Sequence, residues 1–382
     1  MDYLGNVLIR SDLSVPLFDS IVHDDYRIKK AIEVIPLIKD KSRTVTFISH
    51  LGRPNTYIED LSLKHLISSF SKHISEEVKF IDEIDNKEIS KTLLSSNDFK
   101  VYLLENLRFN KGEVNNYSSF AKEIALPFDT YIFDAFGSAH RNHASVVKIG
   151  DYLKSYQGPL VDKEISELNV IRDPECDPFT LILGGAKVSD KLELINSLLP
   201  KVEKLLIGGA MCFTFFKAMD KNIGNSKYEE DMISECKNII QDKNFKKIIL
   251  PLDIGVTNNL ESTNRSDISY DEICDNDIGI DIGPKSVKIF SQYINKAKTI
   301  FWNGPMGIFE KESFNNGTNE ITRLVQNAKA YTIVGGGDTV NAIRKFGDIK
   351  LFNYVSTGGG ASLKYLEGKE LPGINKYPSL II

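Results

Sequence analysis

Ten short apolar runs alternate along this chain with longer segments of helical spacing. The runs are rich in Val, Ile, Phe and Tyr and are apolar on both faces, which is typical of parallel strands covered by helices. Leu63, Leu66, Ile67 and Phe70 illustrate the helical spacing. The alternation predicts doubly wound α/β domains. The predicted strands are 6–10, 45–49, 100–105, 130–135, 180–184, 204–208, 246–251, 299–303, 331–335 and 353–357.

The length of the chain predicts how many such domains it forms. It has 382 residues, and at about 150 residues per domain this length predicts two domains, each with its own core. A Gly-Pro turn precedes a helical pattern that starts near Leu160 and ends before Asp173. We therefore expect an N-terminal domain over 1–155, an interdomain helix over 156–172 and a C-terminal domain over 173–367.

The composition argues against several classes of protein. A formal net charge of −5 disfavours a general nucleic-acid binder, which is usually basic. The cysteines Cys176, Cys212, Cys236 and Cys274 form no C-x-x-C pair, which favours a reducing compartment. The sequence shows no signal-peptide core and no apolar run of about 20 residues that could span a membrane. We expect a cytoplasmic protein without a membrane partner.

In the first half, polar and charged residues follow the predicted strands. Asp12, His50 and three arginines, Arg53, Arg108 and Arg141, lie in strand-end loops, and Arg27 lies near one. Open α/β sheets bind ligands at the carboxyl edge of the strands, and guanidinium groups match phosphate and carboxylate oxygens. A single arginine is usually a surface charge, but four at one edge predict a site for a small polyanion.

In the second half, glycine-rich loops follow the strands instead, in LGGAKVSDK, IGGAM, WNGPMG, VGGGDT and STGGGAS. One such loop is usually a tight strand-to-helix turn, but five in succession bring bare backbone N–H groups to one edge and favour nucleotide binding. No G-x-x-x-x-G-K-[ST], strand-associated G-x-G-x-x-G or protein-kinase motif set is present. These absences argue against a P-loop protein, a dinucleotide fold and a protein kinase.

Three features of these loops point to phosphate chemistry, and each has a plainer alternative. Lys187 and Lys191 are four apart, so we expect them on one face of a starting helix, where such pairs are most often solvated. Asp338 could hold Mg²⁺ on nucleotide phosphates, or could be the N-cap of the following helix. The three glycines 358–360 at a helix start would let backbone donors approach a phosphate.

The motifs taken together resemble phosphoglycerate kinase, in that family's order, from about Val7 to Leu371. Such an ordered set is a very specific signal. The resemblance implies two doubly wound parallel-sheet, Rossmann-like α/β domains that face each other across a hinged cleft. It also implies that segment 368–382 packs on the N-terminal domain. The motifs are RSDLSVP, DDYRI, SHLGRP, ENLRF, DAFGSAHR, GGAKVSDK, WNGPMGIFE, VGGGDT, STGGGASL and LEGKELPG.

The resemblance implies an activity as well. This activity is reversible phosphoryl transfer between 1,3-bisphosphoglycerate and ADP, giving 3-phosphoglycerate and ATP, with Mg²⁺, in glycolysis or gluconeogenesis. The expected partners are these small molecules alone, without nucleic acid or membrane, and the expected state is a hinge-bending monomer.

The resemblance further implies roles for individual residues of the first half. Asp12 would contact the glycerate hydroxyl, and Arg27 would meet the carboxyl end and the transferring phosphoryl group. Ser14 would stand at a neighbouring substrate-binding position. The 3-phosphate would be held by His50, Arg53, Arg108 and Arg141.

In the second half, Lys187 would follow the transferring group and Lys191 would contact the nucleotide phosphates. Asp338 would hold the Mg²⁺–nucleotide and Thr339 its phosphates. The remaining implied residues are Gly185, Gly208 and Gly209 on the adenine side, Asn303 and Glu310 near the phosphates and ribose, Gly337 in the nucleotide loop, and Gly358, Gly359 and Gly360 as backbone donors to the transition state.

Two residues depart from the family pattern. Ser14 stands where the family usually has Asn, so one substrate hydrogen bond would be lost or bridged by water, a change of about 1 kcal/mol. Ala210 stands in place of the third glycine of the adenine-side loop. Two alternatives therefore remain open: a divergent kinase for another carboxylic acid, and a catalytically idle nucleotide-binding or scaffold protein.

Overall fold

The computed structural model describes residues 3–74, 76–95, 99–173, 177–374 and 376–380. The chain divides into two compact units, one formed by Met1–Ile165 with Glu370–Ile382 and the other by Ser166–Lys369. The chain thus passes between the units twice. Cys176 lies outside the described residues.

The first unit is built on a six-stranded parallel sheet with the strand order β5-β6-β4-β1-β7-β8. The order places the ends of β6, β4, β1 and β7 next to one another. The strands are β1 (Gly5–Ser11), β4 (Ser42–Ile48), β5 (Val78–Ile81), β6 (Lys100–Leu104), β7 (Thr130–Asp134) and β8 (Lys154–Gln157), and a separate hairpin joins β2 (Leu17–Phe18) to β3 (Ile21–Val22).

Helices connect these strands, as parallel pairing requires. They are α1 (Tyr26–Ile32), α2 (Ile35–Ile38), α3 (Ile67–His73), α4 (Asn86–Leu94), α5 (Lys111–Val114), α6 (Ser118–Ala125) and α7 (Ala144–Val147). A further helix, α8 (Pro159–Asn169), follows β8 and contains the boundary between the two units.

The alternation of side chains along β1 decides which residues are core and which face the other layer of helices. Val7 and Ile9 join one buried cluster with Ile28 of α1 and Phe70 of α3. Full burial of such a side chain stabilises the fold by about 1.5–3 kcal/mol. Arg10 follows Ile9, so it points to the opposite face, where its side chain is also almost fully buried.

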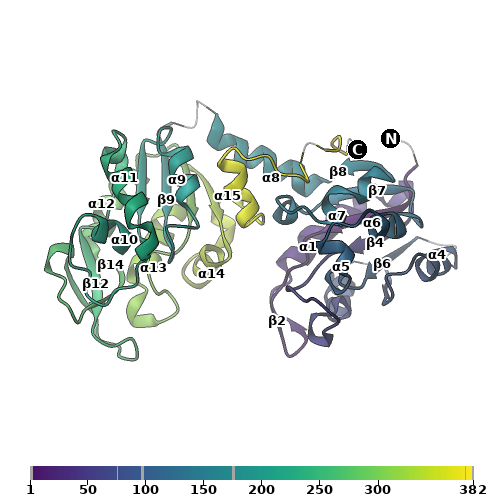
Figure 1. Cartoon of the computed structure of the whole chain (residues 1–382), viewed down its shortest axis with the longest axis horizontal. Helices are drawn as coiled ribbons and strands as arrows, with labels where there is room; N and C mark the ends of the chain where they lie inside the picture. Colours follow the sequence, from purple (N-terminus) through teal and green to yellow (C-terminus); the bar gives the residue numbers. More distant parts are fainter. Residues whose placement is uncertain (1–2, 75, 96–98, 174–176, 375, 381–382) are drawn as a thin grey trace. The chain divides into compact units, whose positions relative to one another are not determined.

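The segment after residue 369 lies beside β8 in the first unit (Figure 1). The backbone N–H of Gln157 donates to the carbonyl of Pro378 at 2.8 Å, and the N–H of Leu380 donates to the carbonyl of Gln157 at 2.9 Å. The N–H of Gly373 donates to the carbonyl of Ala139 at 2.9 Å. These bonds tie the segment to β8 and to the loop after β7.

The second unit contains another six-stranded parallel sheet, ordered β11-β10-β9-β15-β16-β17. Its strands are β9 (Phe179–Leu183), β10 (Lys204–Ile207), β11 (Ile248–Ile249), β15 (Thr299–Asn303), β16 (Tyr331–Gly335) and β17 (Tyr354–Val355). Its helices are α9 (Leu192–Leu198), α10 (Met211–Ala218), α11 (Ile233–Gln241), α12 (Pro284–Ile294), α13 (Asn316–Gln326), α14 (Gly337–Phe346) and α15 (Gly360–Leu366).

Trp302 of β15 is completely buried in the core of this unit, with Phe290 of α12 and Ile321 of α13. Its indole N–H donates to the carbonyl of Gly304 at 2.8 Å, so the polar atom of this large side chain is satisfied. The core therefore anchors the loop that leaves β15.

All ten predicted strands are present, and the prediction of parallel α/β sheets is confirmed. Several further elements were not predicted: β5, β8, the β2–β3 hairpin and a small antiparallel sheet of β12 (Asp253–Thr257), β13 (Ser266–Ser269) and β14 (Ile278–Ile282). No helix in the described part of the chain is long and apolar enough to cross a membrane.

Candidate active site

Four neighbouring strands of the first sheet end in the residues that the sequence singled out. Asp12 follows β1, His50 follows β4, Arg108 follows β6 and Arg141 follows β7. His50 and Arg108 are buried, whereas Asp12 and Arg141 are half-buried. The sheet order therefore gathers one carboxylate, one imidazole and two guanidinium groups at one edge.

Arg27 reaches this group from α1. Its Nη1 donates to Oδ2 of Asp12 at 2.5 Å, and the backbone N–H of Ser14 donates to Oδ1 of Asp12 at 3.1 Å. Burial alone would raise the pKa of Asp12, but interactions with Arg27 and, in smaller measure, with His50 and Arg10 outweigh it and lower this pKa to about 2. Asp12 is thus held as a carboxylate.

The arginines of this edge repel one another. Burial lowers the pKa of Arg108 to about 10, and the charges of Arg141, Arg10 and Arg53 add to the shift. Burial also lowers the pKa of Arg141, with Arg53 as the next cause. Within the described residues, Nε of Arg108 and Nε of Arg141 are buried without a hydrogen-bond partner. Such a cluster is suited to an anion with several oxygens.

The side chain of Ser14 makes at most one weak hydrogen bond within this site. Its Oγ lies 3.5 Å from the carbonyl oxygen of His50, at the limit of a hydrogen bond. Arg53 is exposed, whereas Arg108 is buried and Arg141 is half-buried.

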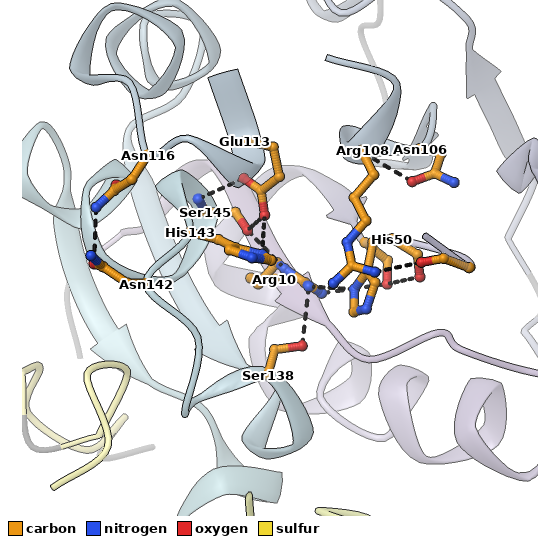
Figure 2. A network of polar contacts seen from close by, with 12 residues as sticks. Arg10, His50, Asn106, Arg108, Glu113, Asn116, Ser138, Asn142, His143 and Ser145 are labelled. Carbon is orange, nitrogen blue, oxygen red and sulfur yellow. Dashed lines mark hydrogen bonds and ion pairs between the residues drawn. The ribbon is translucent and has the colours of Figure 1, made fainter. Parts of the chain in front are cut away.

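A buried polar network behind the anion site was not assigned a role from the sequence. It joins Arg10 to His50, Ser138 and Ser145, and Ser145 to Glu113 (Figure 2). The signal available in the sequence was an arginine at the carboxyl end of an otherwise apolar strand, one residue before the strand-end loop.

The second unit contains a cavity of about 440 Å³ at the ends of its strands. Its walls are mostly apolar with a few polar groups, as in many small-molecule sites. The lining includes Gly185, Gly209, Ala210, Cys212, Phe213, Ile280, Met306, Phe309, Glu310 and Asp338.

The backbones of two glycine loops meet at the edge of this cavity. A Cβ on Gly209 would lie 2.5 Å from both the nitrogen and the oxygen of Gly185. Gly209 also has a φ of +66° and Gly185 a φ of +93°, values that favour glycine. The third position of the loop, Ala210, also lines the cavity.

The prediction that Lys187 and Lys191 share one face of a starting helix is wrong. Helix α9 begins only at Leu192, and residues 184–191 form turns in which the N–H of Lys191 donates to the carbonyl of Val188. Lys191 is buried beside Gly185, and burial lowers its pKa, whereas Lys187 is exposed. The positive φ of Gly185 turns the chain away from helical geometry.

Two further strand ends are joined by hydrogen bonds. The amide of Asn303 donates to the carbonyl of Gly335 at 2.8 Å, and the N–H of Gly304 donates to Oγ1 of Thr339 at 2.7 Å. Of the predicted nucleotide residues, Gly185, Gly209, Glu310 and Asp338 line the cavity. The other predicted nucleotide residues do not line it; they are Lys187, Lys191, Gly208, Asn303, Gly337 and Thr339. The glycines 358–360, predicted as donors to the transition state, do not line it either.

Asp338 is exposed in the first turn of α14, whose N-cap is Gly336, so the alternative that Asp338 is the N-cap is wrong. In the part of the chain that the structure describes, no three His, Cys, Asp or Glu side chains form a metal-binding group. A lone carboxylate still fits Mg²⁺, because this ion usually takes one or two carboxylates with substrate phosphates and water.

Gly358 and Gly359 precede α15, whose first residue is Gly360, and Gly359 is its N-cap at a φ of +54°. A Cβ on Gly359 or Gly360 would meet no atom within 4 Å. Gly359 and Gly360 therefore leave open space beside the backbone at the start of the helix.

An arginine-rich anion site on one parallel sheet and a glycine-lined cavity on a second are typical of a two-domain α/β kinase that acts on a small molecule. The chain belongs to the phosphoglycerate kinase family, whose model matches residues 4–369. This is a family of transferases with a carboxyl group as phosphoryl acceptor.

Relatives and solved structures agree with this assignment. The phosphoglycerate kinase of Finegoldia magna is 45% identical over 381 residues, covering 97% of this chain and 95% of that protein. The phosphoglycerate kinase of Dictyoglomus turgidum is 42% identical and covers 96% and 94%. The structure of phosphoglycerate kinase from Coxiella burnetii matches with a TM-score of 0.86 and 35% identity, covering 98% of this chain and 96% of that one.

Proposed function

We propose that this chain catalyses the Mg²⁺-dependent, reversible transfer of a phosphoryl group between 1,3-bisphosphoglycerate and ADP, giving 3-phosphoglycerate and ATP. One observation carries the proposal beyond family membership. Arg108 and Arg141 gather at one sheet edge with buried Nε–H groups that have no partner among the described residues. A phosphate group would supply the missing acceptors and cancel the repulsion between the guanidinium groups.

In the first unit, the 3-phosphate would bind to His50, Arg53, Arg108 and Arg141. Asp12, held as a carboxylate, would accept a hydrogen bond from the glycerate hydroxyl. Arg27 would meet the carboxyl end of the substrate, and Ser14 would offer one hydroxyl beside it.

In the second unit, the cavity would take the nucleobase against Gly185 and Gly209. Gly208, which precedes Gly209 but does not line the cavity, would lie behind them on the adenine side. The phosphates would extend toward Lys187, Lys191 and Thr339. Asn303, Glu310 and Gly337 would line the path between base and phosphates, and Gly358, Gly359 and Gly360 would donate backbone N–H groups to the transferring phosphoryl group.

The chemistry needs no general base. The acceptor is a carboxylate with a solution pKa of about 3.5–4, so it is already ionised at neutral pH. The chain must instead cancel repulsion between the carboxylate and the incoming phosphoryl group. Arg27, Lys187 and the glycine N–H groups would do this, so catalysis would be mostly positioning and electrostatics.

Magnesium fits the exposed carboxylate of Asp338 at the start of α14. When bound, the ion would neutralise charge on the nucleotide phosphates. Asp338 would orient the phosphates beside Thr339, its neighbour in the same turn.

We also propose the organisation that the sequence led us to expect: an N-terminal substrate domain over 1–155, an interdomain helix over 156–172, a nucleotide domain over 173–367 and segment 368–382 with the N-terminal domain. Phosphoryl transfer requires the two substrates to approach within bonding distance and water to be excluded. Hinge bending of a cytoplasmic monomer would meet both requirements.

The proposal is tested by ATP-dependent turnover of 3-phosphoglycerate, coupled to glyceraldehyde-3-phosphate dehydrogenase and followed as loss of NADH. We expect turnover that EDTA abolishes and Mg²⁺ restores. The matched variants are Arg141→Met, which should raise KM for 3-phosphoglycerate, and Arg323→Met, an exposed arginine of α13, which should not.

Two other outcomes would contradict the proposal in different ways. Turnover with another carboxylic acid alone would point to Ser14 as the mark of a divergent substrate. Binding of ATP without turnover of any acid would favour a nucleotide-binding protein that has lost catalysis.

A further inference from the structure

Arg10 is one of the largest fully buried side chains of the molecule, with 1% of its surface exposed. A guanidinium group has five N–H donors and no acceptor. The protein supplies five acceptors. Nε donates to Ser145 Oγ at 3.0 Å, Nη1 to the Ser11 carbonyl and, at 3.4 Å, to Ser49 Oγ, and Nη2 to His50 Nδ1 at 2.8 Å and to Ser138 Oγ at 3.2 Å.

Because its donors all have partners within the protein, Arg10 has no N–H group left for a ligand. This separates it from Arg108 and Arg141, whose Nε atoms have no partner in the described part of the chain. Arg10 can therefore influence an anion at this edge only through its charge and through the residues that it contacts.

The contact with His50 determines the state of the imidazole. Since the guanidinium can only donate, Nδ1 of His50 must accept, so it carries no proton. The ring is then neutral, with its hydrogen on Nε2. Burial, with the charge of Arg10 as the next cause, lowers the pKa of His50 well below its usual range, and Arg108 and Arg141 lower it further while Asp12 acts in the opposite direction.

A buried carboxylate balances the charge of Arg10. The Oγ of Ser145, which accepts from Arg10, donates to Oε1 of Glu113 at 2.6 Å, and the N–H of Ser145 donates to Oε2 at 2.9 Å (Figure 2). Burial would raise the pKa of Glu113, but His143, Arg10 and Ser145 outweigh it and lower this pKa. Glu113 is therefore an anion linked to Arg10 through one hydroxyl.

We propose that Arg10, held by Ser145 and Glu113, is a positioning residue that fixes His50 as the neutral tautomer with its proton on Nε2. The imidazole then meets the substrate anion as an N–H donor and not as a cation. This inference rests on the proposed function for the part that His50 plays in substrate binding. The tautomer itself can be measured whether or not the chain turns over 3-phosphoglycerate.

The first experiment is ¹⁵N–¹H NMR of the imidazole rings in the full wild-type chain, with His50 assigned by the signal that His50→Gln removes. We expect an unprotonated Nδ1 and a protonated Nε2 that stay unchanged from about pH 5.5 to 8, the range in which a free histidine titrates. A proton on Nδ1, or titration of His50 in this range, would overturn the inference.

The second experiment compares His50→Gln with His50→Asn. The amide nitrogen of Gln reaches the place of Nε2. The amide of Asn reaches only the place of Nδ1, where its oxygen can accept from Arg10, and it leaves no donor at the place of Nε2. We expect KM for 3-phosphoglycerate to rise about tenfold or less for Gln and by clearly more for Asn, with one good hydrogen bond worth about 1–1.5 kcal/mol. Equal effects, or a milder effect for Asn, would argue against a donor at Nε2.

The third experiment uses Arg10→Met, which removes the guanidinium N–H group that donates to Nδ1 of His50. His50 should then titrate, and KM for 3-phosphoglycerate should fall as the pH is lowered, because the ring becomes a cation. A merely structural role would change stability without this pH profile. Arg323→Met serves as the control. An Arg10→Met variant that folds, keeps the wild-type His50 tautomer and shows no change of KM with pH would refute the proposal. If Arg10→Met does not fold, the first two experiments decide.

Discussion

The hydroxyl of Thr339 accepts a hydrogen bond of 2.7 Å from the backbone N–H of Gly304, which ties the first turn of α14 to the loop after β15. Both residues are buried. A hydroxyl that accepts this bond still has its own hydrogen to donate, and in the proposed site it would donate to a nucleotide phosphate.

Thr339→Val keeps the shape of the side chain but removes both bonds. The N–H of Gly304 would be left buried without an acceptor, so we expect the free energy of unfolding to fall by about 1–3 kcal/mol and KM for ATP to rise several-fold. Urea unfolding and steady-state kinetics measure the two effects. Thr339→Ser is the matched control and should nearly keep the wild-type free energy of unfolding and KM for ATP. Equal changes in the Ser and Val variants would be inconsistent with a role for the hydroxyl.

Arg27, paired with Asp12 at 2.5 Å, is expected to act on the transition state. We predict that Arg27→Ala lowers kcat by about 10²–10³, as the loss of one electrostatic donor does elsewhere, while Kd for ATP stays within about twofold. Single-turnover kinetics and nucleotide titration separate the two quantities. An unchanged kcat would remove Arg27 from this role.

When no anion is bound, we expect the charge of Arg141 to lower the free energy of unfolding. Because burial and repulsion by Arg53 and Arg10 outweigh the attraction of Asp12 for its charge, we expect Arg141→Met to raise the free energy of unfolding by roughly 0.5–1 kcal/mol while it raises KM for 3-phosphoglycerate at least tenfold. Inorganic phosphate should raise the Tm of the wild type more than that of the variant. A less stable variant with unchanged KM would show that Arg141 is structural.

Two glycines should respond to alanine in opposite ways. Gly209→Ala would place a Cβ 2.5 Å from the backbone of Gly185 at a φ of +66°, so we expect a loss of stability of at least about 1–3 kcal/mol. Gly360→Ala meets no atom within 4 Å and should leave stability equal or better by about 0.5–1 kcal/mol. Its kcat should nevertheless fall, because the methyl group would occupy space proposed for the phosphoryl group. Wild-type kcat for Gly360→Ala would count against that placement.

The raised pKa of Asp134 predicts that the free energy of unfolding depends on pH. Its Oδ1 accepts from the N–H groups of Leu160 and Val161 at 2.8 and 3.2 Å, and burial raises its pKa to about 7 despite these bonds. Since the unfolded carboxyl has a pKa of about 3.9, the native state binds this proton more tightly. The free energy of unfolding should therefore fall as the pH rises from about 4 to about 7 and level off above.

Asp134→Asn tests this dependence, because it keeps an acceptor for the start of α8 but cannot titrate. Urea unfolding between about pH 5 and 8 should show a falling curve for the wild type and a flatter one for the variant. Parallel curves would mean that Asp134 is ionised throughout this range.

Sequence reasoning located the two parallel sheets because their strands are apolar on both faces, as in Leu181–Leu183 and Val7–Ile9. It missed β13, whose residues Ser266–Ser269 are exposed or half-buried and carry little apolar signal. A polar strand at the rim of a small antiparallel sheet is specified by its partner strand and not by its own hydrophobic pattern.

The candidate site was predictable where strand order alone decides it, and not where distant residues converge. The positions of Asp12, His50 and Arg108 directly after predicted strands are enough to predict that they share one edge. The burial of Arg10 depends on Ser138 and Ser145, which are 128 and 135 residues away in the chain, and no local pattern reveals that contact. Lys187 was misplaced because a glycine turn at Gly185 overrides helical spacing.

The first unit is assembled from two separated stretches of chain, with Ser166–Lys369 between them. During translation at about 5–20 residues per second, the ribosome needs tens of seconds to deliver the intervening stretch. For that time the edge of β8 lacks the N–H and carbonyl partners that Leu380 and Pro378 give to Gln157. The nascent first unit therefore presents an unpaired strand edge, the surface at which other chains can add, until its final piece leaves the ribosome.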